Sequence, residues 1–132
     1  MYNSIFTEGI IMGDKRILLV DDTTYMRLMI KVILLKAGFT ICGEGADGLE
    51  AIEKYKTLLP DLLILDIAMP KMNGVAALKE ILKEYPKAKV VMCSSRGQDS
   101  DVIDALSSGA TDFVVKPYQS DRIVSIITKA LK

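Results

Sequence analysis

The sequence predicts an α/β fold in which helices cover both faces of a doubly wound sheet of five parallel strands. Two observations lead to this prediction. Short runs that are apolar on both faces alternate five times with amphipathic segments of helix length, as buried parallel strands and their crossover helices do. Several of these runs also end at charged residues, and in a parallel sheet those ends lie along one edge.

The first half of the chain contains two strands and two helices. The apolar run at 16–20 is the first strand and stops at two aspartates. Apolar residues then recur at helical spacing over 25–36, and Gly38 is a natural end for that helix. A second strand at about 39–44 leads to a helix near 49–58.

The second half repeats this alternation three times. Pro60 precedes the third strand, and Pro86 closes the helix that follows it. The expected strands are 62–65, 90–93 and 112–115. The expected helices are about 74–85, about 98–108 and 121–131. Right-handed crossovers between parallel strands then place helices on both faces, in three layers.

Length and composition indicate one domain. The chain has 132 residues and a formal net charge of zero, so nothing points to nucleic acid or an anionic membrane as a partner. Its longest apolar stretch, 26–35, is broken by Arg27 and Lys31 and is too short to span a membrane. Cys42 and Cys93 lack metal-ligand spacing and are interpreted as reduced thiols. We therefore expect a cytoplasmic protein, and we expect it to be a monomer.

The domain is expected at residues 14–132, after an N-terminal extension at 1–13 that is a candidate for disorder. The extension lacks a basic leader and carries Glu8, so it does not match a secretory signal. Met12 lies just before the first strand, which leaves two possible starting residues open: Met1 and Met12.

The charged strand ends predict a site for a divalent cation and a phosphoryl group. Asp21 and Asp22 follow the first strand, Asp66 follows the third, and Lys116 follows the fifth. Crowded carboxylates repel one another unless a cation lies among them, and Mg²⁺ (or Mn²⁺) suits oxygen ligands. Lys116 and the Ser94 hydroxyl could hold the remaining phosphoryl oxygens.

Each of these residues also has a simpler interpretation. An aspartate before a helix can cap it, although a single cap does not need both Asp21 and Asp22. Asp66 can form a turn, and Lys116 can be a surface lysine. The bond between Lys116 and Pro117 is a candidate cis peptide, a form that is largely confined to X-Pro bonds.

Four motifs, taken together and in order, resemble the receiver domain of two-component response regulators. They are ILLVDD at 17–22, DIAMPKMNG at 66–74, Ser94, and the Lys116-Pro117 pair. The resemblance extends from about residue 15 to 131, and the segments around Ser94 and Lys116 look most like the chemotaxis branch. It implies a flavodoxin-like fold with strand order 2-1-3-4-5.

The resemblance also implies a role for each site residue. Asp66 would be the phosphoacceptor, and Mg²⁺ would be held by Asp21, Asp22, Asp66 and the backbone carbonyl of Ala68. Ser94, Ser95 and Lys116 would bind the phosphoryl group. Ser94 and Phe113 would form the switch, Ser94 moving towards the phosphoryl group as the ring at position 113 turns inward.

The implied function is signal transduction through partners. The chain contains no histidine, so it carries no phosphohistidine of its own, and the resemblance implies a partner histidine kinase as the phosphodonor. Expected targets include a component of the flagellar motor switch, and a phosphatase is a further candidate partner. A regulator in a non-chemotaxis phosphorelay is the alternative. We expect a phosphoacceptor that catalyses only its own phosphorylation and dephosphorylation, not an enzyme acting on outside substrates.

Two rival functions are less consistent with the sequence. Residues 43–48 match the G-x-G-x-x-G dinucleotide motif, but Glu44 and Asp47 would bring negative charge to a pyrophosphate. A phosphatase of the haloacid dehalogenase kind needs an acid two residues after its nucleophile, and Ala68 stands there. Ala68 also departs from the polar residue common at this position among receivers, as Phe113 departs from the usual tyrosine.

Overall fold

The computed structural model describes residues 14–95 and 100–132. Its strands are β1 (Arg16–Val20), β2 (Thr40–Gly45), β3 (Leu62–Asp66), β4 (Val90–Ser94) and β5 (Asp112–Val115). Its helices are α2 (Thr24–Lys36), α3 (Gly48–Leu58), α4 (Gly74–Glu84), α5 (Ser100–Ser107) and α6 (Ser120–Leu131). The expectations for residues 1–13 and 98–99 lie outside the described residues.

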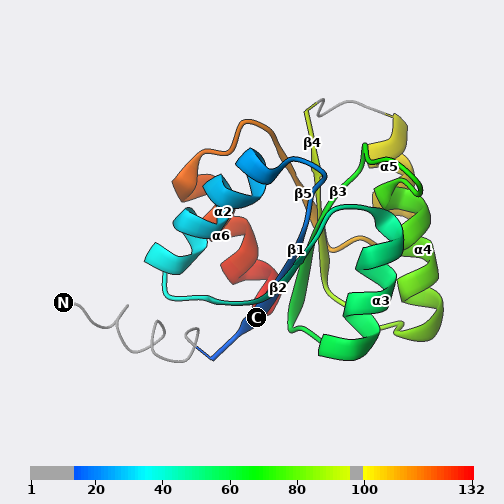
Figure 1. Ribbon diagram of the computed structural model, residues 1–132, viewed down its shortest axis with the longest axis horizontal. Coiled ribbons are helices and arrows are strands. Elements are labelled where there is room, and N and C mark those ends of the chain that lie inside the picture. The colour runs from blue at the N-terminus through cyan, green and yellow to red at the C-terminus, as the bar shows by residue number, and fades with distance from the viewer. Residues whose placement is uncertain (1–13, 96–99) are drawn as a thin grey trace.

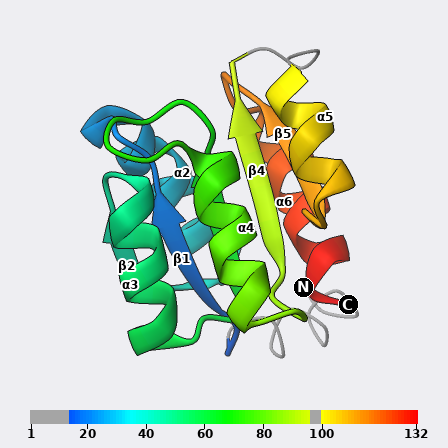
Figure 2. The same cartoon turned by 90° about the vertical axis from the view of Figure 1, so that its right-hand side faces the viewer.

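The strands form one five-stranded parallel sheet in the order β2-β1-β3-β4-β5. This confirms the expected doubly wound α/β fold. Helices α2 and α6 cover one face of the sheet, and α3, α4 and α5 cover the other (Figure 1). Because all strands run in the same direction, their carboxyl ends lie at one edge of the sheet, at the top in Figure 2.

Alternation along the strands divides the core into two clusters. In β1, Ile17 and Leu19 point into a cluster with the apolar faces of α2 and α6, which we call the α2/α6 core. Leu18 and Val20 point the other way, into a cluster with α3, α4 and α5, which we call the α3/α4/α5 core. Both clusters pack on the same strands, so the central strands are buried on both faces.

The observed boundaries differ from the expected ones by one or two residues over the described part of the chain. The main difference is that β3 continues through Asp66 and β4 through Ser94. Asp66 pairs with Cys93 and Ser94 with Val115 in the sheet ladder. The apolar pattern predicts that each strand ends at its last apolar residue. In the structure, backbone pairing with the neighbouring strand continues each strand by one polar residue. Both polar residues are therefore held by the sheet itself.

None of the helices in residues 14–95 and 100–132 combines the length and apolar character needed to cross a membrane.

Candidate functional site

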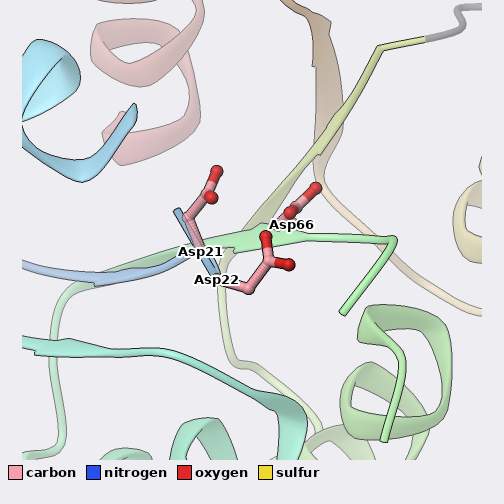
Figure 3. A group of neighbouring side chains, drawn as sticks. All are labelled: Asp21, Asp22 and Asp66. Atoms are coloured by element: carbon pink, nitrogen blue, oxygen red, sulfur yellow. The ribbon is translucent and has the colours of Figure 1, made fainter. Parts of the chain in front are cut away.

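Three carboxylates meet where β1 and β3 end. Asp21 and Asp22 directly follow β1, and Asp66 is the last residue of β3 (Figure 3). Each offers an oxygen that lies within 4.8 Å of the oxygens of the other two. Asp21 and Asp66 are only 6% and 5% exposed, while Asp22 is exposed. The structure thus brings together the three acidic residues that the sequence singled out.

Lys116, which follows β5, places its ammonium group between two of these carboxylates. Its Nζ lies 2.7 Å from Asp21 Oδ2 and 3.2 Å from Asp66 Oδ1. The peptide bond between Lys116 and Pro117 is cis, as anticipated. The Lys116 N–H donates a hydrogen bond to the Ser94 carbonyl at 2.8 Å, which ties the ends of β4 and β5 together.

The charges at this site perturb one another. Burial, followed by the negative charge of Asp21, raises the pKa of Asp66 from 3.8 to about 6, and Lys116 offsets only part of this. Burial lowers the pKa of Lys116, but its hydrogen bond to Asp21 and its attraction to Asp66 outweigh burial, so that this pKa is raised overall. One ammonium therefore does not neutralise three carboxylates, and the site retains negative charge.

A pocket of about 240 Å³ opens over these groups. Its lining residues are Asp22, Asp66, Ile67, Ala68, Ser94, Ser95, Asp101 and Lys116. Ser94 is buried, Ser95 is exposed, and both face this pocket from the end of β4. Phe113 does not line the pocket; it is half-buried and packs against the α3/α4/α5 core.

Close backbone packing shapes the loop after Asp66, which carries Ala68. The Ile67 N–H donates to the Cys93 carbonyl at 3.0 Å, and the Gly74 N–H donates to the Ile67 carbonyl at 2.8 Å. A Cβ atom at Gly74 would lie 2.0 Å from the Asp66 carbonyl oxygen. Only glycine permits this approach, so the loop closes directly against the strand that carries Asp66.

The simpler interpretations account for only part of the geometry. Thr23, not an aspartate, is the N-cap of α2, although Asp21 Oδ1 accepts the Thr23 N–H at 2.9 Å. In the rival dinucleotide motif, Asp47 caps α3 by accepting the Glu50 N–H. Glu44 in the same motif pairs with Arg27 and Lys31. These acidic residues have structural partners and do not form an anion-binding loop.

Two polar residues at the site were not identified from the sequence. Asp101, in the first turn of α5, lines the pocket. Arg27, in α2, donates from Nη1 to the Asp21 carbonyl at 2.5 Å. Both occupy polar positions of amphipathic helices, and hydrophobic periodicity assigns such positions to solvent. The position of Asp101 shortly after the end of the fourth strand was the available signal for that residue.

The donor set fits Mg²⁺. Mg²⁺ prefers oxygen ligands, retains several waters, and is commonly held by one or two carboxylates together with phosphate oxygens. Here three carboxylates converge, one of them exposed, beside a pocket with room for water and a phosphoryl group. Burial and the negative charge of Asp21 raise the pKa of Asp66, and a cation beside this carboxylate would favour its ionised form.

Comparisons with known proteins point to one family. Residues 17–128 match the model of the response regulator receiver domain. The chain is 51% identical over 118 residues to the chemotaxis protein CheY of Thermotoga maritima, covering 89% of this chain and 98% of the relative. It is 53% identical over 116 residues to CheY of Bacillus subtilis, covering 88% and 97%.

A solved structure also resembles the whole described fold. The CheX–CheY–BeF3–Mg complex of Borrelia burgdorferi contains a chain that superposes with a TM-score of 0.85 at 34% identity. The match covers 89% of this chain and 90% of the other. With this fold, this site and these relatives, the chain belongs to the response regulator receiver domain family and is of the CheY-like type.

Proposed function

We propose that Asp66 accepts a phosphoryl group from the phosphohistidine of a partner kinase, and that phosphorylation changes the affinity of this protein for a target. The receiver unit is residues 14–132, with residues 1–13 as an extension. The observation that carries this proposal is the convergence of three carboxylates and Lys116 at one pocket. The chain contains no histidine, so a phosphohistidine donor has to be carried by a partner.

Asp21, Asp22, Asp66 and the backbone carbonyl of Ala68 would hold Mg²⁺, or Mn²⁺ in its place. When bound, the cation neutralises charge on the phosphoryl oxygens. Ala68 lines the pocket and is exposed, so its carbonyl belongs to an accessible part of the loop. Asp22 is exposed on the same side of the pocket and can reach the cation or one of its waters.

In the transfer step, a carboxylate oxygen of Asp66 attacks phosphorus while the P–N bond to the partner's histidine breaks. The new P–O bond forms an acyl phosphate, and the imidazole nitrogen keeps the electron pair of the broken bond. Lys116 exchanges its contact with Asp66 for a phosphoryl oxygen. Ser94 and Ser95 supply hydroxyl donors from the end of β4, in the same pocket.

We propose that the acyl phosphate is lost by hydrolysis in the same site. A water molecule must then attack phosphorus, and Asp66 is the leaving carboxylate. Ala68 offers no polar side chain to orient that water, so the residue at this position affects the rate of hydrolysis. The protein acts in this scheme on its own Asp66 and not on outside phosphate esters.

Output would follow from Ser94 moving towards the phosphoryl group and Phe113 turning inward. The surface formed by α5, β5 and α6 lies beside these residues and exposes Ile103, Leu106 and Val115. A component of the flagellar motor switch is the proposed target, since several relatives are named chemotaxis protein CheY. A partner phosphatase is a further candidate contact.

The proposal can be tested with acetyl phosphate and Mg²⁺. We expect mass spectrometry to detect one added phosphate that is acid-stable and base-labile. Asp66→Asn should take up none, and Asp121→Asn, at an exposed position of α6, should behave as wild type. Uptake of the same label by Asp66→Asn, or full labelling in excess EDTA, would contradict the proposal.

A further inference from the structure

Arg27 makes a contact with the cation site that the proposed function does not use. It lies in the first turn of α2, and its side chain is 16% exposed. Nη1 donates a hydrogen bond to the backbone carbonyl of Asp21 at 2.5 Å. Asp21 and Asp22 would bind the cation through their side chains, so Arg27 contacts this part of the site through the main chain and leaves both carboxylates available.

Glu44, at the end of β2, fixes the orientation of this guanidinium. Arg27 Nε lies 3.2 Å from Glu44 Oε1, and Lys31 Nζ lies 2.5 Å from Glu44 Oε2. The hydrogen bond from Lys31, aided by Arg27, lowers the pKa of Glu44. Lys54 also donates to the Glu44 carbonyl. Two cations of α2 therefore hold the Glu44 carboxylate and Lys54 of α3 holds its carbonyl, so that Glu44 presents a fixed acceptor to Arg27.

The contact completes the polar environment of Asp21. The Asp21 N–H donates to the Gly45 carbonyl at 3.1 Å, and its carboxylate is engaged by Thr23 N–H at 2.9 Å and Lys116 Nζ at 2.7 Å. Arg27 binds the carbonyl. That carbonyl belongs to the planar peptide group joining Asp21 to Asp22, so its direction sets where the next residue projects.

We infer that Arg27 is a positioning residue for the cation site: by holding the Asp21 carbonyl, it fixes the peptide plane from which both adjacent carboxylates face the cation. The inference rests on the proposed function, since it assumes that these carboxylates bind Mg²⁺. Fixed ligands lose less freedom on binding, and groups that orient metal ligands commonly contribute strongly to metal affinity.

Charge and positioning predict opposite effects when Arg27 is replaced. As a nearby positive charge, Arg27 repels a divalent cation, so its removal should tighten Mg²⁺ binding if charge alone mattered. As a positioning residue, its removal should weaken binding. Lys31 provides a matched control, because it carries the same charge and binds the same glutamate without contacting Asp21.

The test is calorimetric titration of Mg²⁺ into the full-length protein and its variants. We expect Arg27→Met to weaken Mg²⁺ binding by about tenfold, as loss of an orienting group does at other metal sites. Lys31→Met should change the Mg²⁺ affinity by less than about twofold, because the lost charge is screened and Arg27 keeps its own contacts with Glu44 and the Asp21 carbonyl. Arg27→Lys should also bind Mg²⁺ more weakly than wild type, since one ammonium cannot bridge Glu44 and the Asp21 carbonyl as the guanidinium does.

Each outcome has a separate meaning. If Arg27→Met binds Mg²⁺ as tightly as wild type or more tightly, the positioning role is wrong. If wild type itself binds no Mg²⁺, the proposed function fails instead. Urea unfolding in EDTA shows whether each variant is folded. Should Arg27→Met not fold, Glu44→Ala keeps Arg27 but removes the acceptor that orients it, and unchanged Mg²⁺ affinity in that variant would overturn the inference.

Discussion

Asp66 is held in an environment that disfavours its charged form. Burial and the charge of Asp21 raise its pKa to about 6, although Lys116 Nζ lies 3.2 Å away. In the unfolded chain the same carboxyl returns to an ordinary value near 3.8. At neutral pH the ionised carboxylate therefore lowers the stability of the metal-free fold, and the same excess of negative charge favours a cation.

The raised pKa of Asp66 predicts how the stability of the metal-free protein depends on pH. Because the pKa of Asp66 is higher in the folded state than in the unfolded state, protonation of Asp66 stabilises the fold as pH falls. Between pH 7 and pH 5, Asp66 should add about 1 kcal/mol to the free energy of unfolding of the metal-free protein. The measurement is urea unfolding in EDTA of wild type and Asp66→Asn, comparing their difference at the two pH values. A difference that does not change with pH would contradict the prediction.

Lys116 should matter more for the response to phosphorylation than for phosphorylation itself. We expect Lys116→Met to retain some labelling by acetyl phosphate, because Asp66 and the other carboxylates remain. It should lose the changes in amide chemical shift that beryllofluoride, an acyl phosphate mimic, induces in β5 and α6. Lys79→Met, which removes only an exposed pair with Asp104, is the control. Wild-type shift changes in Lys116→Met would show that Lys116 is not part of the switch.

The residues that could be predicted from sequence share one property. Asp21, Asp66 and Lys116 each interrupt or follow an apolar run, so the pattern itself marks them. Arg27 and Asp101 could not be found in this way, because each is one polar residue among several on a helix. Each residue reaches the site only because its turn of the helix packs against the strand ends, and the sequence pattern does not show how a helix packs on the sheet.

Among the elements, strands and helices were placed to within one or two residues over the described chain. The sequence could not show that β3 and β4 extend to Asp66 and Ser94, because the extension depends on pairing with Cys93 and Val115 of neighbouring strands. It also could not show how closely α4 approaches β3. Both features depend on contacts between segments that are distant in sequence.

The approach of α4 to β3 can be tested at Gly74. Alanine is intrinsically favoured over glycine within a helix by up to about 1 kcal/mol. Its Cβ would nevertheless lie 2.0 Å from the Asp66 carbonyl oxygen. We expect Gly74→Ala to lower the free energy of unfolding by more than about 2 kcal/mol and to weaken Mg²⁺ binding, because the clash displaces the strand end.

Gly38→Ala is the matched control. Gly38 has a φ of +93° but no atom within 4 Å of an added Cβ, so alanine there meets conformational strain without a clash. Gly38→Ala should lower the free energy of unfolding by about 1 kcal/mol and leave the Mg²⁺ affinity unchanged. Urea unfolding in EDTA and calorimetric Mg²⁺ titration give the two quantities for each variant. Equal Mg²⁺ affinities for Gly74→Ala and wild type would contradict the proposed effect on the site.

At the scale of the whole molecule, the two cores share one sheet. Neighbouring residues of β1 face opposite sides, with Leu19 in the α2/α6 core and Leu18 in the α3/α4/α5 core. Neither core can lose its strands while the other keeps them. The cation site lies at the edge of the same strands, so its geometry depends on both layers of helices remaining packed.

This arrangement predicts a single cooperative unfolding transition. Leu34→Ala in the α2/α6 core and Leu78→Ala in the α3/α4/α5 core each truncate a fully buried side chain. Each should lower the free energy of unfolding by about 2–5 kcal/mol.

Two probes should give the same unfolding midpoint within each variant. Far-ultraviolet circular dichroism follows the whole fold, and tyrosine fluorescence follows both cores, because Tyr118 lies in the α2/α6 core and Tyr55 in the α3/α4/α5 core. Saturating Mg²⁺ should add the same increment to both variants, since binding acts on the one folded state that contains the site. Two separate midpoints in either variant would show that one layer unfolds while the other keeps the sheet.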